Sequence, residues 1–152
     1  MRLSRSQVPV KQITTGTLCH LEAAMVQGAL EEWDLKQLDF LFIENVGNLV
    51  CPSSYDLGEH LRLVLISVTE GEDKPLKYPT IFNSADVAVV TKVDLAAAVE
   101  FSWETAYNNI RAVRPGMPVF KVSAKTGEGM EEHLKFLDAR LIELRQPLGT
   151  LS

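Results

Sequence analysis

The sequence Asp39-Phe-Leu-Phe-Ile-Glu-Asn-Val-Gly-Asn-Leu-Val-Cys-Pro52 joins a short apolar run to a loop that contains glycine. An apolar run of this length, bounded by polar residues and glycine, is typical of a strand buried on both faces, as in a parallel sheet. Glu44 follows the run directly, and Gly47 lets bare backbone approach a ligand. Because ligands bind at the carboxyl ends of strands in open α/β sheets, we expect Glu44, Gly47 and Cys51 to face a site. The alternative is an ordinary buried strand that ends in a turn.

Short apolar runs alternate with helical patterns along the rest of the chain. The runs predict strands at residues 8–13, 61–68, 86–90 and 118–122. Helical spacing predicts helices at residues 21–32, near Thr80, from the N-cap Ser102 to about Arg114, and over 130–145. The last helix carries on one face the apolar residues Leu134, Leu137, Leu141 and Ile142. We therefore expect an α/β fold with a mostly parallel sheet flanked by helices, in one domain over residues 1–145, with a loose tail at 146–152.

The bulk properties of the 152 residues argue against several classes of protein. A net charge of −5 argues against a nucleic-acid-binding protein, because binding to phosphates needs a basic face. No apolar run approaches the roughly 20 residues of a membrane span, and residues 1–6 lack the apolar core of a signal peptide. We therefore expect a cytoplasmic protein. That reducing compartment favours metal binding or catalysis by its two cysteines over a disulfide.

Two polar motifs follow expected strands in the second half of the chain. In Thr91-Lys-Val-Asp94, the Asp94 carboxylate can accept hydrogen bonds from N1–H and the amine of guanine, while the stem of Lys92 lies across the base. In Val122-Ser-Ala-Lys-Thr-Gly-Glu-Gly129, the small Ala124 lets its backbone N–H reach a purine oxygen. The alternatives are surface residues that cap a strand and a glycine-rich turn that enters a helix. Together and in this order, the motifs resemble the base-recognition motifs of GTP-binding proteins, whose Asn-Lys-x-Asp form has Thr91 in place of Asn here.

Cys19, His20 and Cys51 form a second candidate site. Cys19 and His20 lie in a glycine-containing loop before an expected helix, and Cys51 follows the loop after residues 39–43. Because helix N-termini lower the pKa of a thiol, this position favours the metal-binding thiolate. Two thiolates and an imidazole suit Zn²⁺ or Ni²⁺, with a further ligand from water or a second subunit. The alternative is that both cysteines are small buried apolar residues. His60 and His133 have no such context and are expected at the surface.

Three long strings resemble the HypB family, the GTPases that help to insert nickel into nickel–iron hydrogenases. They are Thr15-Gly-Thr-Leu-Cys-His-Leu-Glu-Ala23, Phe42-Ile-Glu-Asn-Val-Gly-Asn-Leu-Val-Cys-Pro52 and Ser67-Val-Thr-Glu-Gly-Glu-Asp-Lys-Pro-Leu-Lys-Tyr-Pro79. The resemblance runs from about Val8 to about Leu137. It implies a P-loop GTPase (SIMIBI-like) fold that dimerises with GTP and has a metal site near the dimer interface.

The resemblance also assigns roles to residues and implies cofactors and partners. The family's metal ligands fall on Cys19, His20 and Cys51, and its switch loop falls on residues 44–48, which include Glu44 and Gly47. Its guanine motifs fall on Lys92, Asp94, Ser123, Ala124 and Lys125. The implied cofactors are Ni²⁺ or Zn²⁺ and GTP or GDP with Mg²⁺. The implied partners are a second copy of the chain, other hydrogenase-maturation proteins and the hydrogenase large subunit.

The sequence departs from the family in one large respect. It contains no Gly-x-x-x-x-Gly-Lys-Ser/Thr string, and in the family this phosphate-binding loop lies upstream of the part that begins at about Val8. The chain therefore resembles the C-terminal portion of a HypB domain without its P-loop strand, and we expect an unpaired sheet edge or an exposed apolar face. Two interpretations stay open: a nickel-insertion GTPase, or a catalytically inactive metal-binding or dimerisation module derived from one. Without the phosphate cradle we expect no GTP hydrolysis by these residues alone.

Overall fold

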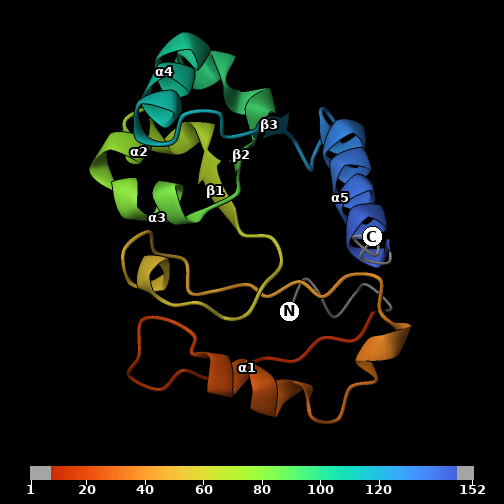
Figure 1. Cartoon of the computed structure of the whole chain (residues 1–152). Coiled ribbons are helices and arrows are strands. Elements are labelled where there is room, and N and C mark those ends of the chain that lie inside the picture. Colours follow the sequence, from red (N-terminus) through yellow and green to blue (C-terminus); the bar gives the residue numbers. More distant parts are fainter. Residues whose placement is uncertain (1–7, 147–152) are drawn as a thin grey trace, which may run out of the picture. The chain divides into compact units, whose positions relative to one another are not determined.

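The structure, a computed structural model, describes residues 8–146 (Figure 1). The chain forms two compact units, one that ends at Glu59 and one that begins at His60. Of the expected tail at residues 146–152, residues 147–152 lie outside the described part, and the single domain over residues 1–145 stays a prediction. Across residues 8–146, no helix combines the length and the apolar composition that crossing a membrane requires.

The described part of the second unit is built on a parallel sheet of three strands. These are β1 (Leu63–Ser67), β2 (Val87–Thr91) and β3 (Val119–Val122), in the order β1-β2-β3. The central strand β2 is buried at its first four positions, as the valine-rich run of a strand covered on both faces requires. The predicted α/β fold with a parallel sheet is confirmed, and each strand begins and ends within two residues of its predicted range.

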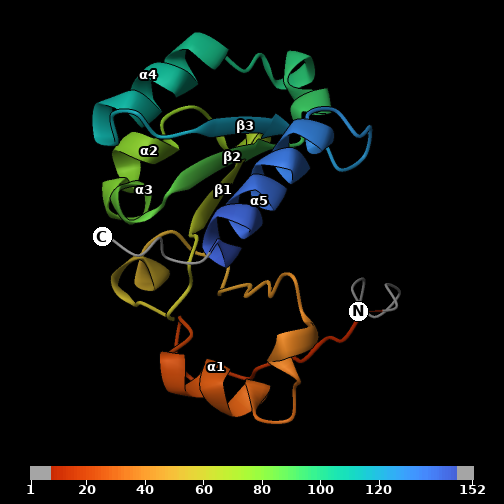
Figure 2. The same cartoon turned by 45° about the vertical axis from the view of Figure 1, so that its right-hand side comes forward.

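Three helices lie on one side of this sheet and α5 (Met130–Arg145) lies on the other (Figure 2). The three are α2 (Lys74–Lys77), α3 (Pro79–Ser84) and α4 (Trp103–Val113). They supply the fully buried Phe82 and Ile110 to the core. α4 begins where predicted, because the Ser102 hydroxyl accepts from the N–H of Thr105 at 3.3 Å. Short 3₁₀ helices in the described chain are Leu35–Gln37, Cys51–Ser54, Val68–Glu70, Val93–Leu95 and Ala97–Val99.

The helix α5 packs through only part of its predicted apolar face. Met130 and Phe136 join an apolar cluster with β2 and β3, and Leu137 is buried. Leu134 and Ile142, which the pattern places on the same face as Leu137, are 51% and 59% exposed. A helix of 16 residues is about 24 Å long and extends past strands of four or five residues, which span about 17 Å at most.

The edge of the sheet at β1 is open within residues 60–146, as the sequence predicts. β1 pairs only with β2 in this range, and its Leu65 side chain is 58% exposed. An open strand with an exposed apolar side chain offers its backbone groups to another strand.

The first unit contains α1 (Ala23–Leu30) and extended loops, and residues 8–59 form no strand. The predictions of strands at residues 8–13 and 39–43 are therefore wrong. Phe42 is 72% exposed and Leu41 is 39% exposed, although a strand buried on both faces was expected there. A strand needs a neighbour to bond its N–H and C=O groups, and no strand among residues 8–59 provides one.

Candidate functional site

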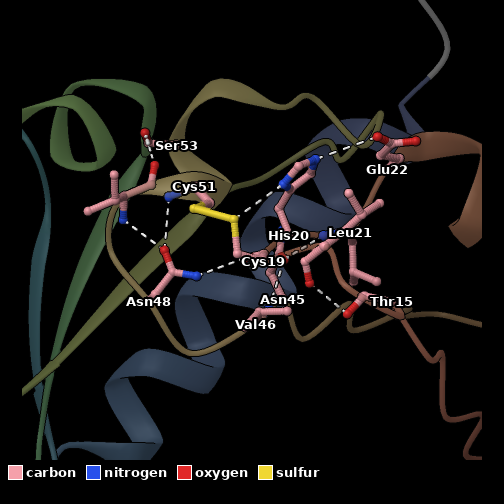
Figure 3. Close-up of a disulfide and its surroundings, with 12 residues drawn as sticks. Thr15, Cys19, His20, Leu21, Glu22, Asn45, Val46, Asn48, Cys51 and Ser53 are labelled. Carbon is pink, nitrogen blue, oxygen red and sulfur yellow. Dashed lines mark hydrogen bonds and ion pairs between the residues drawn. A yellow bond between two sulfur atoms is a disulfide. The ribbon is translucent and has the colours of Figure 1, made fainter.

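Cys19 and Cys51 lie side by side in the first unit (Figure 3). They are 32 positions apart in the sequence, and their Cα atoms are 6.0 Å apart. Their sulfur atoms form a disulfide, so the expectation of two free cysteines is wrong for this structure. The expectation came from the reducing cellular compartment, which carries no information on how close the two thiols lie. This fold holds them close enough to form a bond. The same convergence is what a shared metal site requires.

The side chain of Asn48 joins the two cysteine loops. Its Nδ2 donates to the carbonyl oxygen of Cys19 at 2.8 Å, and its Oδ1 accepts from the N–H groups of Val50 and Cys51 at 3.0 and 2.9 Å (Figure 3). Asn48 is not among the site residues predicted from the sequence. The signal that could have identified it is the tendency of asparagine in a loop to bond nearby backbone groups.

His20 is the buried side chain of this site, with 6% of its surface exposed. Its Nδ1 lies 3.8 Å from the Cys19 sulfur, and its Nε2 lies 3.6 Å from Oε1 of Glu22 (Figure 3). The second distance is too long for a hydrogen bond, and Nε2 has no hydrogen-bond partner among the described residues. The ring of Tyr55 stacks on the imidazole, with 3.6 Å between ring centroids and 12° between ring planes. Glu22 and Tyr55 are further residues that the sequence-based prediction of the site missed.

The three predicted metal ligands meet, but they do not form a metal centre in the disulfide state. Within residues 8–146 no group of three or more His, Cys, Asp or Glu side chains is arranged to hold a metal ion. A disulfide sulfur is not a thiolate, so Cys19 and Cys51 must be reduced before they can bind a metal. The separation of 3.8 Å between Cys19 Sγ and His20 Nδ1 does fit a shared ion, because a tetrahedral Zn²⁺ shell separates such atoms by about 3.6 Å. The donor set therefore suits Zn²⁺ or Ni²⁺ once the disulfide is open.

The predicted switch residues Glu44 and Gly47 are exposed. A Cβ atom on Gly47 would meet no atom within 4 Å, so no described residue approaches its backbone closely. Between them, Asn45 accepts a hydrogen bond from the N–H of Leu21 at 3.0 Å and anchors the loop beside His20. The roles of Glu44 and Gly47 stay predictions.

In the second unit, the predicted guanine residues lie at the carboxyl ends of β2 and β3. The hydroxyl of Ser123, which is fully buried, donates to Oδ1 of Asp94 at 2.6 Å. The other carboxylate oxygen of Asp94 makes no hydrogen bond to the described residues and is available to a ligand. Lys92 has a left-handed backbone (φ 59°) and an exposed side chain, and Ala124 and Lys125 are exposed. The structure therefore brings the two motifs together, with Ser123 orienting Asp94.

The loop after β3 depends on one glycine. Gly129 has φ +67°, and a Cβ atom there would lie 1.8 Å from the carbonyl oxygen of Lys121. The N–H of Ser123 donates to the carbonyl oxygen of Glu128 at 2.9 Å, which closes the loop. No residue with a side chain fits this position without movement of the backbone, so the position of Ser123 requires glycine here.

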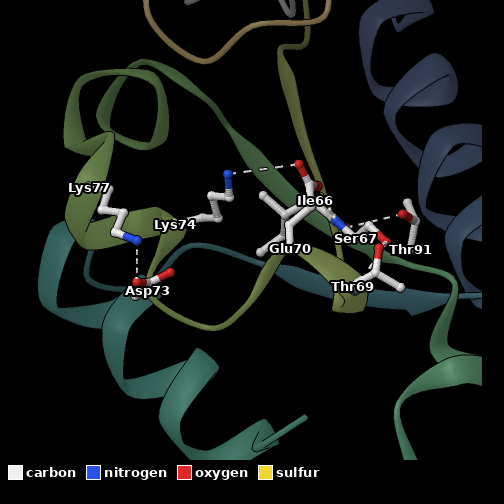
Figure 4. A network of polar contacts seen from close by, with 8 residues as sticks. All are labelled: Ile66, Ser67, Thr69, Glu70, Asp73, Lys74, Lys77 and Thr91. Atoms are coloured by element: carbon white, nitrogen blue, oxygen red, sulfur yellow. Dashed lines mark hydrogen bonds and ion pairs between the residues drawn. The ribbon is translucent and has the colours of Figure 1, made fainter. Parts of the chain in front are cut away.

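Thr91 joins the ends of β1 and β2. Its hydroxyl donates to the carbonyl oxygen of Ile66 at 3.1 Å (Figure 4). At the last residue of β1, the N–H of Ser67 donates to the Glu70 carboxylate at 2.9 Å, and the two residues form a capping box. At α2, the ammonium of the last residue Lys77 donates to the N-cap residue Asp73 and holds the pKa of that exposed carboxyl below its ordinary value. These contacts fix the loop between β1 and α2 beside the end of β2.

Comparisons with known proteins agree with these motifs. Residues 1–121 match the family described as CobW/HypB/UreG, nucleotide-binding domain. The hydrogenase maturation factor HypB of Azotobacter vinelandii is 48% identical over 137 residues, which are 90% of this chain and 45% of that protein. The hydrogenase/urease maturation factor HypB of Helicobacter pylori is 45% identical over 140 residues, which are 90% of this chain and 58% of that protein. The chain thus spans about half the length of the curated relatives that it matches.

Two solved structures resemble the fold. The crystal structure of HypB from Helicobacter pylori in complex with nickel has a TM-score of 0.89 and 42% identity, and it covers 98% of this chain and 71% of that chain. The crystal structure of the hydrogenase maturation factor HypB from Archaeoglobus fulgidus has a TM-score of 0.84 and 41% identity, and the match covers 92% of this chain and 68% of that chain. The sequence matches and the shared fold lead to one conclusion: this chain belongs to the CobW/HypB/UreG nucleotide-binding family and, within it, to the HypB proteins.

Proposed function

We propose that this chain is the metal-binding and guanine-binding part of a hydrogenase maturation factor that handles nickel. The observation that carries the proposal is the convergence of Cys19 and Cys51 on the buried His20 in the first unit. Relatives at 45–48% identity are named hydrogenase maturation factors, and a structural relative is a complex with nickel. Both support the same interpretation.

The metal is the cargo of the proposed activity. In the reduced chain, the thiolates of Cys19 and Cys51 and the imidazole of His20 bind one Ni²⁺ or Zn²⁺. A symmetric second copy of the chain, or water, supplies the remaining ligand, because three protein ligands leave a tetrahedral shell incomplete. The homodimer is therefore part of the proposal, as are transfer partners among the other maturation proteins and the hydrogenase large subunit.

Guanine nucleotide is the proposed second ligand. Asp94 accepts from the base, Lys92 lies across it, and the loop of Ser123, Ala124 and Lys125 closes on its oxygen. Support comes from the hydrogen bond that Ser123 donates to Oδ1 of Asp94, because it orients a carboxylate whose other oxygen makes no hydrogen bond to the described residues. The 152 residues hold no phosphate-binding loop, so Mg²⁺ and triphosphate lack their usual ligands in this part of the protein. For these 152 residues taken alone, that same observation favours the second candidate function, a catalytically inactive metal-binding or dimerisation module.

Metal titration of the reduced chain tests the proposal. The wild type, Cys19→Ala and Cys51→Ala are kept in a phosphine reductant and titrated with Zn²⁺ and with Ni²⁺ by calorimetry. We expect the wild type to bind one ion per chain or one per two chains, with lower affinity at lower pH because thiolate ligation releases protons. Both variants should lose most of this binding. Glu31→Ala, which alters an exposed carboxylate at the end of α1, is the matched control and should bind as the wild type does.

Equal stoichiometry and affinity in the wild type and in both cysteine variants would show that neither cysteine binds the ion, and the metal assignment would fail. Light scattering with and without the ion then tests the dimer. A mass that stays that of one chain when the site is saturated would remove the homodimer from the proposal.

A further inference from the structure

The two ring nitrogens of His20 face chemically different neighbours. Nδ1 lies 3.8 Å from the sulfur of Cys19, and Nε2 lies 3.6 Å from a carboxylate oxygen of Glu22 (Figure 3). A neutral imidazole has one N–H donor and one acceptor nitrogen, so the neighbours decide which nitrogen holds the proton. A carboxylate accepts from N–H, whereas a metal ion needs the lone pair of the other nitrogen.

Glu22 is placed for this interaction and not for helix capping. It occupies the N-cap position of α1, where Ser, Thr, Asp or Asn would normally bond the first N–H groups, and its side chain makes no cap hydrogen bond. Its side chain is 48% exposed, so it has room to close the few tenths of an ångström that separate the pair from a hydrogen bond. Nε2 is buried and has no hydrogen-bond partner among residues 8–146. Such a nitrogen gains free energy when an acceptor reaches it.

Tyr55 fixes the plane of the imidazole. The two rings are nearly parallel, at 12°, with centroids 3.6 Å apart, and only 6% of the His20 surface is exposed. A ring that is stacked and buried cannot flip without displacing its neighbour, so the assignment of one nitrogen to the sulfur and the other to the carboxylate persists.

We propose that His20 binds the metal through Nδ1, and that Glu22 is a positioning residue that holds the proton on Nε2 while Tyr55 holds the ring plane. The inference rests on the proposed metal site and goes beyond it, since it names the ligating atom and two residues outside the predicted ligand set.

Long-range ¹H–¹⁵N correlation spectra of the reduced, ¹⁵N-labelled chain at neutral pH test this assignment. Without metal, we expect His20 as the tautomer with the proton on Nε2. With Zn²⁺, we expect the Nδ1 resonance to move while Nε2 keeps its proton. Coordination through Nε2, or a metal-free tautomer protonated on Nδ1, would overturn the proposal. The metal-free spectrum decides the tautomer even if the chain binds no Zn²⁺, so failure of the metal site and failure of this inference are distinguishable.

Variants of the two positioning residues provide a second readout. Glu22→Ala should mix the His20 tautomers and weaken Zn²⁺ binding about tenfold or more, as losses of a carboxylate behind a metal-binding histidine do. Glu22→Gln keeps an acceptor oxygen and should retain the Nε2–H tautomer, and Glu31→Ala should match the wild type. Tyr55→Phe keeps the stacked ring and should bind Zn²⁺ as the wild type does. Tyr55→Ala loses the ring and should bind Zn²⁺ more weakly than the wild type. A Glu22→Ala chain that has the wild-type tautomer and affinity would refute the role of Glu22.

Discussion

At the level of single residues, amide, hydroxyl and carboxylate side chains in loops hold both candidate sites together. Asn48 bonds backbone groups of both cysteine loops, Ser123 orients Asp94, and Thr91 joins the end of β2 to the carbonyl of Ile66. The motif of GTP-binding proteins has asparagine at the position of Thr91. Here the Thr91 hydroxyl instead forms a hydrogen bond that links the end of β2 to the end of β1.

Asn48→Ala should separate the cysteine loops, because it removes three hydrogen bonds. Each such bond contributes about 1 kcal/mol, so we expect at least a tenfold lower effective concentration of one thiol at the other. The disulfide–thiol equilibrium against glutathione measures this quantity. Asn48→Asp keeps the acceptor oxygen and loses the donor to Cys19, so it should lie between the wild type and the alanine variant. Gln27→Ala, at an exposed amide in α1, is the control. A disulfide–thiol equilibrium in Asn48→Ala equal to that in Gln27→Ala would show that Asn48 does not hold the two cysteine loops together.

Asp94→Asn should weaken GDP binding, because an amide offers only one acceptor where guanine presents two donors. Hydrogen bonds to a charged group contribute about 1.5–3 kcal/mol, so a loss of tenfold or more is expected. Xanthosine diphosphate presents an oxygen in place of the amine and should lose less. Competition with a fluorescent nucleotide measures both, and Asp138→Asn, at an exposed position on α5, is the control. An unchanged GDP affinity would show that Asp94 does not recognise the base.

At the level of elements, pairing partners decide which parts of the sequence predict structure correctly. β1, β2 and β3 were predictable because each lies beside another in the same unit, so an apolar run meets the neighbour that it needs. Residues 39–43 have an equally apolar sequence, but no strand among residues 8–59 pairs with them, and Phe42 is exposed. The proposed ligands Cys19, His20 and Cys51 carry chemistry in their residue type. Glu22 and Tyr55 act through position alone, which no pattern in the sequence gives, whereas Asn48 has only the general tendency of a loop asparagine to bond nearby backbone groups.

The contact between α5 and β3 should make stability depend on pH. His133 lies edge-on to Phe120, with ring centroids 5.2 Å apart, and burial lowers its pKa from the ordinary 6.5. The unfolded chain then binds more protons than the folded one just below pH 6.5. The free energy of unfolding therefore falls as pH drops through 6.5 toward the lower pKa of the folded state. The contribution of the neutral His133 to stability is fully present above pH 6.5.

Urea unfolding at pH 7.5 and pH 5.5 measures this dependence. His133→Phe should lose less stability between the two pH values than the wild type, and His60→Gln, at an exposed position, should behave as the wild type does. Parallel losses in the wild type and His133→Phe would show that His133 does not contribute.

At the level of the whole molecule, the chain matches about half the length of its relatives and contains the two motifs proposed to bind the base without a phosphate-binding loop. We expect these 152 residues to show no GTP hydrolysis, because stabilisation of the phosphates provides most of the rate in this chemistry. A phosphate-release assay with Mg²⁺ checks this, with the Asp94→Asn chain as the blank for contaminating enzymes. Activity above the blank that requires GTP would contradict the expectation.

The disulfide also changes the chain as a polymer. The bond between Cys19 and Cys51 closes a ring over 32 positions, and the first unit has one described α-helix, short 3₁₀ helices and no described strand to hold it together. A ring of this size removes about 3 to 4 kcal/mol of chain entropy from the unfolded state. A metal ion bound by the same two sulfurs would close the same ring. Reducing the disulfide without binding a metal therefore leaves the unfolded state of the first unit with its largest chain entropy. The gain or loss of this one cross-link then sets how much of the first unit stays folded.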